Sequence, residues 1–149
     1  MIPKVYNHDA FKHWIELPVR FNDLDALNHV NNAVFNSYFE EARLNFVQQI
    51  PEWMNDISEG KSFVLRQAKI DYIAPIKYPE VLLIGSGIIR VERVRVSALQ
   101  GIYSKSTHKL HAIAETTGVW FDLQTQRPAP LPEVKGLETF LLSLDHLQS

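Results

Sequence analysis

The feature that most constrains the fold of this chain is a change of hydrophobic period within its first fifty residues. From Ile15 to Phe21 every second residue is apolar, which is the period of a half-buried β-strand. After Asn32 the apolar residues instead recur every three or four positions, which predicts one long amphipathic helix over residues 32–50 that stops at Pro51. The residues of this apolar stripe are Phe35, Phe39, Ala42, Phe46 and Ile50.

Strand-like patterns dominate the rest of the chain. Alternation over residues 64–72 predicts a second half-buried strand, and further apolar runs predict strands over 81–94, 96–105 and 110–123. The first half of segment 81–94 is apolar on both faces, which is expected of a strand covered on both sides and suggests association with another copy. The order β-α-β-β-β-β predicts an α+β fold in which one helix packs on a largely antiparallel sheet.

Prolines and turn-forming residues mark the connections between these elements. Pro75 and Pro79 bracket a turn, and residues 106–109 suggest a hairpin. The proline-rich segment 127–132 must be extended, because each proline disfavours helix at the residue before it. Beyond that segment, an apolar pattern over residues 134–144 predicts a short terminal helix.

Composition limits the possible classes of function. The chain has 149 residues, with 15 Lys and Arg against 17 Asp and Glu, and no Cys. The absence of Cys excludes a disulfide scaffold, a thiolate metal site and a cysteine nucleophile. A near-neutral charge gives no bulk attraction to nucleic acid or to an anionic membrane. With neither a signal-like apolar core at the N-terminus nor a membrane-length apolar run, we expect one cytoplasmic domain, residues 1–149, that binds neither partner.

Most of the candidate chemistry lies between the first strand and the helix, in residues 20–32. This segment holds the carboxylates Asp23 and Asp25, the imidazole of His29 and several asparagines. A helix N-terminus presents unpaired backbone N–H groups and a partial positive charge, which suit a developing oxyanion. A nearby carboxylate can take a proton from water. The combination would serve the addition of water to an acyl carbonyl.

The same residues have a purely structural interpretation. Asp and Asn before a helix most often cap it or form turns. A lone histidine such as His29 is commonly a hydrogen-bonded structural residue. On the helix, Glu40 and Arg43 are spaced i and i+3, which predicts a local ion pair. The residues alone leave both interpretations open.

A family resemblance favours the catalytic interpretation. Residues 23–32, followed by Phe35, Tyr38 and the Glu-Glu-Ala-Arg of residues 40–43, resemble the start of hotdog-fold acyl-CoA thioesterases. The pattern is most similar to the 4-hydroxybenzoyl-CoA thioesterase branch, which has D-x-D-x-x-G-H-V-N-N and then E-x-A-R on the helix. Further likeness lies in residues 70–75 and in 119–123 with Arg127-Pro128 after them, so the resemblance covers almost the whole chain.

This resemblance implies both a fold and an activity. The fold is a curved antiparallel sheet wrapped around the long helix. Two subunits pair through their sheets as a homodimer, or as a homotetramer made of two such dimers, and active sites lie at the dimer interface. The activity is hydrolysis of an acyl-CoA thioester without a metal or an organic cofactor.

Roles follow for several residues of the junction motif. Asp25 corresponds to the catalytic acid of the family, acting as general base on water or as nucleophile, and the resemblance does not decide which. The backbone N–H at Asn32 would hold the thioester oxygen. Asn31 and His29 would shape the junction and contact substrate, whereas Asp23 would order the loop.

The chain departs from the family pattern at two places. Asn28 stands where the family usually has Gly, and we expect it to adopt the left-handed conformation, which asparagine tolerates best among non-Gly residues. Arg95-Val96-Ser97 stands where members often carry a Gly-basic-Ser turn that helps to place CoA. Candidates for binding the CoA phosphates, expected near one hairpin connection, are Arg90, Arg93, Arg95 and Lys105.

Two other functions remain open. A hotdog hydratase or dehydratase would need a paired histidine and acid, for which His29 and Asp25 are conceivable. A non-catalytic protein that binds acyl thioesters is suggested by the missing Gly at Asn28. The order of Asp before His and the E-x-A-R helix resemble the thioesterase branch more closely.

Overall fold

The computed structural model describes residues 9–142. One long helix, α1, is accompanied by six strands, a short helix α2 and two 3₁₀ turns, η1 and η2. In chain order the elements are β1 (His13–Pro18), η1 (Phe21–Asp23), α1 (Asn32–Val47), α2 (Pro51–Ser58), β2 (Lys61–Tyr72), β3 (Val81–Val91), β4 (Arg95–Ser104), β5 (Leu110–Asp122), β6 (Arg127–Pro128) and η2 (Leu137–Phe140).

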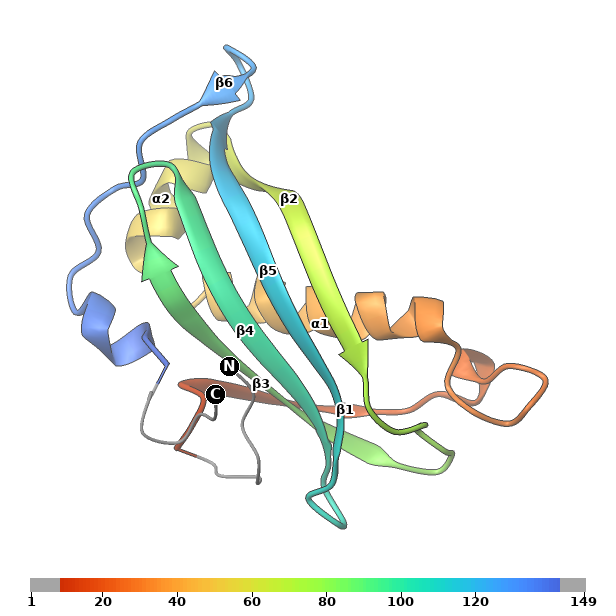
Figure 1. Cartoon of the computed structure of the whole chain (residues 1–149). Helices are drawn as coiled ribbons and strands as arrows, with labels where there is room; N and C mark the ends of the chain where they lie inside the picture. The colour runs from red at the N-terminus through yellow and green to blue at the C-terminus, as the bar shows by residue number, and fades with distance from the viewer. Residues whose placement is uncertain (1–8, 143–149) are drawn as a thin grey trace.

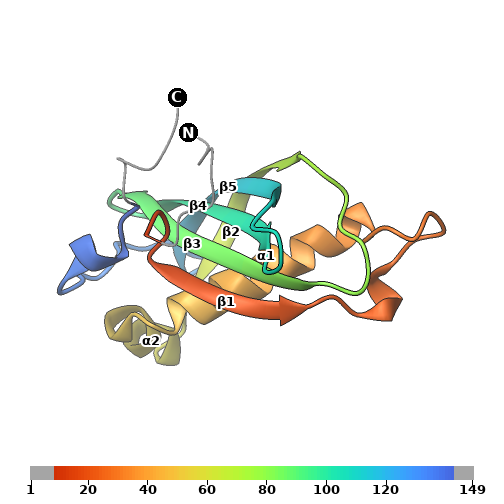
Figure 2. The ribbon, with the colours of Figure 1, turned by 90° about the horizontal axis from the view of Figure 1, so that it is seen from below.

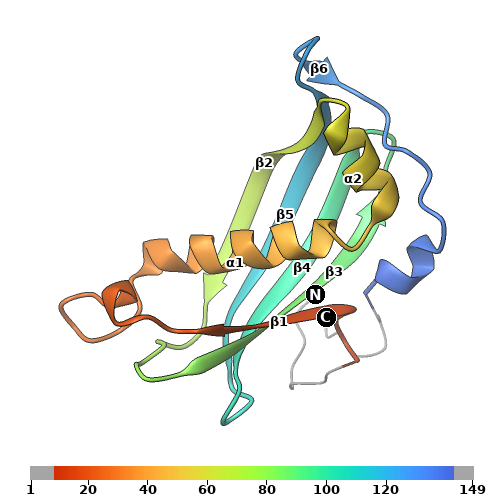
Figure 3. The same cartoon turned by 180° about the vertical axis from the view of Figure 1, so that it is seen from behind.

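The strands form one antiparallel sheet in the order β1-β3-β4-β5-β2, and β6 adds a short pairing to β5. Register shifts interrupt three of the pairings, and such bulges bend the strands that carry them. The sheet is curved, with α1 lying across its concave face (Figures 1 and 3). The predicted α+β class, with one helix on an antiparallel sheet, is therefore confirmed.

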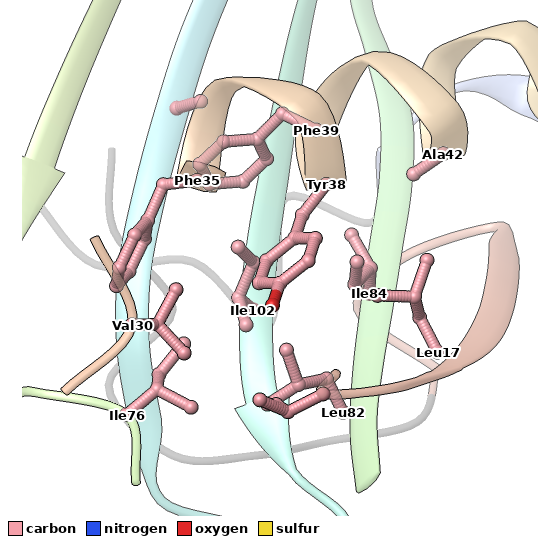
Figure 4. Packing of buried hydrophobic residues seen from close by; sticks show 13 residues of the cluster. Leu17, Val30, Phe35, Tyr38, Phe39, Ala42, Ile76, Leu82, Ile84 and Ile102 are labelled. Carbon is pink, nitrogen blue, oxygen red and sulfur yellow. The ribbon is translucent and has the colours of Figure 1, made fainter. Parts of the chain in front are cut away.

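The core lies between α1 and the concave face of the sheet. The helix buries the first four residues of the predicted stripe, whereas Ile50 lies beyond its end. Figure 4 shows Phe35, Phe39 and Ala42 above strand residues from β1, β3 and β4. The labelled contacts comprise Phe35, Tyr38, Phe39 and Ala42 from α1, with Leu17, Ile84, Leu82, Ile102, Val30 and Ile76 beneath or beside them. A second apolar cluster continues past the end of α1 and includes Ile50, Trp53 and Trp120.

The convex face of the sheet is covered by segments from both ends of the described chain. Phe11 packs against Gly85 and Leu142 packs against Gly87, where a side chain on either glycine would collide with its neighbour. Strand β3 is thus buried on both faces, as predicted, but by its own chain. Its two-sided burial therefore gives no ground for association with another copy.

Several sequence predictions need correction. The long helix ends at Val47, and Pro51 begins α2 at a first-turn position that proline favours, so the stretch after it is helical. Phe21 is 71% exposed, because the chain leaves β1 at Pro18 and turns into η1. The expected terminal helix is the four-residue η2, and its last two predicted residues, 143 and 144, lie outside the described chain.

Strand β2 also departs from its predicted half-buried pattern. Val64 and Tyr72, which were expected to face the core, are 44% and 46% exposed. The reason is position, because β2 is an edge strand with β5 on one side only. No helix among residues 9–142 is long and apolar enough to cross a membrane.

Candidate active site

The loop that joins η1 to α1 is anchored at its base by Asp23, whose side chain is almost wholly buried. The Asp23 carboxylate accepts a 2.6 Å hydrogen bond from the Tyr38 hydroxyl and a 3.0 Å bond from the backbone N–H of Arg20. The guanidinium of Arg20 donates to the other oxygen. The Asp23 carbonyl accepts from the backbone N–H of Asn31, so one residue ties both ends of the loop together.

These contacts determine the charge state of the anchor. Burial alone would raise the pKa of Asp23, but the hydrogen bonds from Tyr38 and Arg20 outweigh it and hold that pKa below its ordinary value. Burial, together with the neighbouring carboxylate, raises the pKa of the Tyr38 hydroxyl. Asp23 is therefore an ionised structural carboxylate whose oxygens are occupied, in line with its expected role in ordering the loop.

Asp25 sits higher in the same loop and is only half-buried. Its Oδ1 atom accepts hydrogen bonds from the backbone N–H groups of Leu27, at 2.8 Å, and His29, at 3.3 Å. The loop closes on the Asp25 backbone as well, through bonds with His29 and Asn28. The Oδ2 atom accepts no hydrogen bond from any described residue, so one oxygen orients the side chain and the other is available.

The turn at Asn28 has the conformation that the sequence predicted. Its φ angle is 62°, in the left-handed region where family members usually have glycine. Asn28 therefore adopts the left-handed conformation expected of it despite the missing glycine.

The first residues of α1 supply backbone donors. Asn31 is the N-cap, and its side-chain oxygen accepts a 2.9 Å hydrogen bond from the N–H of Ala33. Asn32 begins the helix, and its own N–H makes no hydrogen bond within the described part of the chain. The capping interpretation of Asn31 is thus correct, and the cap leaves the neighbouring donor exposed.

These groups line one open pocket of about 440 Å³ at the N-terminus of α1. In Figure 2 the loop extends past the orange end of α1, at the opposite end of the molecule from α2. The pocket is lined by Asp25, His29, Asn31, Asn32, Phe35 and Tyr72, among others. The structure therefore brings together four of the eight residues predicted to act in catalysis or substrate binding, and Arg90, Arg93, Arg95 and Lys105 do not line this pocket.

Tyr72 and the segment 73–75 were not predicted as site residues. The Tyr72 ring contacts the ring of Phe35, and its hydroxyl donates a 3.4 Å hydrogen bond to the Asn32 carbonyl. The only sequence signal was the likeness of residues 70–75 to the family segment that ends in proline. That likeness is consistent with a strand at these residues, but it does not predict that Tyr72 contacts the helix.

The basic residues lie elsewhere. Arg93 is in the β3–β4 turn and Arg95 begins β4, whereas Lys105 follows the far end of that ten-residue strand, roughly 30 Å away. The expectation that they gather near one connection is therefore wrong for Lys105, which forms a 2.9 Å ion pair with Glu16. Arg93, Arg95 and Lys105 do not line the Asp25 pocket of their own chain.

A second cavity of about 340 Å³ lies between the C-terminal half of α1 and the sheet. Its lining includes Glu40, Arg43, Trp53, Phe63, Leu65 and Gln100. The predicted ion pair between Glu40 and Arg43 does not form, because the Arg43 guanidinium instead donates a 3.3 Å hydrogen bond to the Gln100 side chain. We call this space the inner cavity.

Within residues 9–142, no three His, Asp or Glu side chains lie close enough together to hold a metal ion. The expectation of hydrolysis without a metal or cofactor stays a prediction.

Comparison with known proteins identifies the family. Residues 19–140 match the family model of the thioesterase-like superfamily. The chain belongs to this superfamily. It is 30% identical over 121 residues to a chloroplastic acyl-acyl carrier protein thioesterase of Arabidopsis thaliana, covering 80% of this chain but only 64% of that relative. It is 28% identical over 116 residues to a long-chain acyl-CoA thioesterase of Escherichia coli, covering 78% of this chain and 88% of that relative.

Solved structures of this superfamily confirm the hotdog fold. A thioesterase from Thermus thermophilus, crystallised with coenzyme A and zinc, superposes with a TM-score of 0.72 at 34% identity, over 84% of this chain and 89% of that one. A 1,4-dihydroxy-2-naphthoyl-CoA thioesterase from Synechocystis superposes with a TM-score of 0.70 at 28% identity, over 80% of this chain and 88% of that one. The resemblance drawn from the junction motif is therefore confirmed for the family and for the fold.

Proposed function

We propose that this thioesterase-like chain hydrolyses acyl-CoA thioesters, with Asp25 and the backbone N–H of Asn32 as its catalytic groups. One observation carries the proposal. Asp25, with one carboxylate oxygen that accepts no hydrogen bond from residues 9–142, and Asn32, whose backbone N–H likewise has no partner there, line the same pocket. The first is a base or nucleophile, and the second is a donor for negative charge.

The chemistry follows from these two groups. As a general base, Asp25 takes a proton from water, and the resulting hydroxide adds to the thioester carbonyl. The Asn32 N–H and the N-terminal end of α1 stabilise the negative charge on the carbonyl oxygen. The C–S bond then breaks, and the leaving thiolate takes the proton back from Asp25. Direct attack by Asp25 would instead form an acyl anhydride that water hydrolyses.

The proposed substrate is an acyl-CoA. The named relatives are thioesterases of acyl-CoA and of acyl-acyl carrier protein, and the Thermus thermophilus structure holds coenzyme A. In the active site, His29 and Asn31 would contact the substrate beside the thioester. We place the reaction in the cytoplasm and assign it no metal or cofactor, as the sequence predicts.

We further propose that the working unit is a homodimer joined through β2. This strand has twelve residues and one open edge among the described residues, and an exposed edge pairs readily with another strand. A two-fold axis would pair β2 with its copy in antiparallel fashion. The first residues of β2 in one copy would then lie beside the last residues of β2 in the other. The β3–β4 turn of one copy, with Arg93 and Arg95, would approach the Asp25 pocket of the other.

Measurement of free thiol release over a panel of acyl-CoAs tests the catalytic assignment. Asp25→Asn keeps an oxygen that can accept from Leu27 and His29 but lacks the base, so we expect kcat to fall by about 10²- to 10⁴-fold with CoA binding retained. Asp122→Asn is the matched control, because Asp122 also accepts two backbone N–H bonds, from Gln124 and Thr125, in a turn outside the pocket.

The outcomes separate the three candidate functions. Equal rates in the Asp25→Asn and wild-type proteins would refute the role of Asp25. Reversible hydration of an enoyl-CoA without thiol release would identify a hydratase. Tight binding of acyl-CoAs with no reaction would identify a non-catalytic binding protein.

A further inference from the structure

The inner cavity contains a cation with spare hydrogen-bonding capacity. Arg43 belongs to α1 and is half-buried, and it makes one hydrogen bond to a side chain, that of Gln100, although a guanidinium has five N–H donors. No carboxylate of the described residues lies within ion-pair distance of it, and burial lowers its pKa. The cation is therefore partly desolvated without a counter-ion in contact.

The Gln100 side chain that accepts the hydrogen bond from Arg43 is itself held in place by two further hydrogen bonds. Gln100 is fully buried, and its amide nitrogen donates to the carbonyl of Phe39, at 3.1 Å, and to the hydroxyl of Ser86, at 2.9 Å. These bonds leave the amide oxygen of Gln100 facing Arg43. The network holds the guanidinium against an otherwise mostly apolar cavity.

The rest of the cavity wall is mostly apolar. Trp53 is 2% exposed and its indole nitrogen is fully buried, so this residue offers the cavity apolar surface and not a donor. The remaining N–H groups of Arg43 are therefore the available donors of a mostly apolar cavity, and its chemical complement is an apolar ligand that carries an oxygen acceptor.

We propose that Arg43 is a specificity-determining residue that selects acyl groups bearing an oxygen, such as a hydroxyl or carboxylate, on the part of the chain distant from the thioester. This inference rests on the proposed function, since it places the acyl chain of that reaction in the inner cavity. Phe63, Leu65 and Trp53 supply apolar contacts, and Arg43 supplies the donors.

The positions of the two cavities along β2 support the placement of the acyl chain in the inner cavity. Phe63 and Leu65 of the inner cavity and Tyr72 of the Asp25 pocket belong to the same strand, nearly at opposite ends. Antiparallel pairing of two β2 strands places the Phe63 end of one copy beside the Tyr72 end of the other. The acyl chain of a thioester bound at one Asp25 would then enter the inner cavity of the partner copy.

The test compares matched substrates. A series of saturated acyl-CoAs of increasing length is assayed beside the same series with a terminal hydroxyl or a terminal carboxylate. We expect the wild-type protein to prefer an oxygenated series at one chain length. Arg43→Met, which keeps the length of the side chain without its charge, should lower the oxygenated-to-plain ratio of kcat/KM by about 10- to 100-fold.

Two further variants sharpen the interpretation. Arg43→Lys keeps the charge and should restore part of the ratio. Arg127→Met removes an exposed arginine that lines neither cavity and should leave the ratio unchanged.

Preference for the hydroxyl over the carboxylate series would show that Glu40, on the same cavity wall, repels an anion. Preference for the carboxylate would show that Arg43 dominates, and either result supports the proposal.

Calorimetric binding of the same pairs separates this inference from the proposed function. It is measured on the Asp25→Asn protein, or on the wild type if that protein releases no thiol. A tighter complex with the oxygenated partner that Arg43→Met abolishes supports the inference even without turnover. The inference is overturned if the oxygenated and plain series bind equally at every length, or if Arg43→Met weakens both to the same extent.

Discussion

The hydroxyl of Tyr38 donates a 2.6 Å hydrogen bond to the carboxylate of Asp23, which lies fifteen residues earlier in the chain. Tyr38 is in the second turn of α1, and Asp23 is at the base of the loop that carries Asp25. The bond therefore fixes the position of the loop relative to the helix. Because the Asp23 carbonyl also accepts a hydrogen bond from the N–H of Asn31, both ends of the loop depend on this anchor.

Removal of the hydroxyl should cost stability. Tyr38→Phe leaves a buried carboxylate with one donor fewer, so we expect the free energy of unfolding to fall by about 1–3 kcal/mol in urea titrations. Tyr78→Phe is the matched control, because Tyr78 is 46% exposed and should change stability little. A Tyr38→Phe protein as stable as the wild type would show that the bond contributes nothing net.

The same anchor predicts a dependence of stability on acidity. The pKa of Asp23 is lower in the folded chain than its ordinary value of 3.8, so its ionised form stabilises the fold. This contribution is fully present above the ordinary value and is lost as the pH falls through the lower, folded value. Asp23→Asn should therefore be less stable than wild type at neutral pH, and the gap should narrow below about pH 4 in unfolding experiments across that range. A gap independent of pH would contradict the charge-based explanation.

Proline substitution isolates the proposed oxyanion donor. Asn32 is the first residue of α1, a position that favours proline, and Asn31 before it already has an extended ψ of 134°. Asn32→Pro should therefore preserve the helix, remove the backbone N–H together with the asparagine side chain, and lower kcat by about 10²- to 10³-fold. Asn32→Ala keeps the N–H and should retain most activity. If the alanine variant loses as much as the proline variant, the side chain and not the backbone is the functional group.

Mixing two impaired variants tests the shared active site. If Asp25 of one copy works with Arg93 and Arg95 of its partner, a heterodimer of Asp25→Asn with Arg93→Ala/Arg95→Ala contains one intact site. Activity should then rise after the two proteins are unfolded and refolded together. Mixing without exchange of subunits is the control. Sites contained within one chain would give no recovery, and a monomer in sedimentation analysis would exclude the arrangement.

Local patterns predicted the helix and strands well, because their periods depend only on neighbouring residues. The stripe from Phe35 to Phe46 fixed the buried face of α1, and no distant contact was needed to see it. The sequence could not show that Pro51 both follows one helix and starts another, since proline is compatible with either. It also could not show that Val64 is exposed, because that depends on the place of β2 at the sheet edge.

The site divides in the same way. Asp25, Asn28 and Asn32 lie within one loop and the start of one helix, so a sequence motif locates them together. Tyr72 reaches Asn32 across forty residues, and Arg43 turns toward Gln100 across fifty-seven. Contacts at such separations follow from how the sheet curves around α1, which periodicity does not specify.

The cap formed by Phe11 and Leu142 on the convex face has a consequence for solubility. These two side chains, far apart in the sequence, cover the outer face of β3 at Gly85 and Gly87, and Phe11 also lies beside Gly101 of β4. If either segment detaches, a contiguous apolar surface that includes Leu99 and Tyr103 is uncovered while the sheet itself is still folded. The two segments therefore shield the sheet from unintended sheet-to-sheet association, and weakening them would promote aggregation before global unfolding.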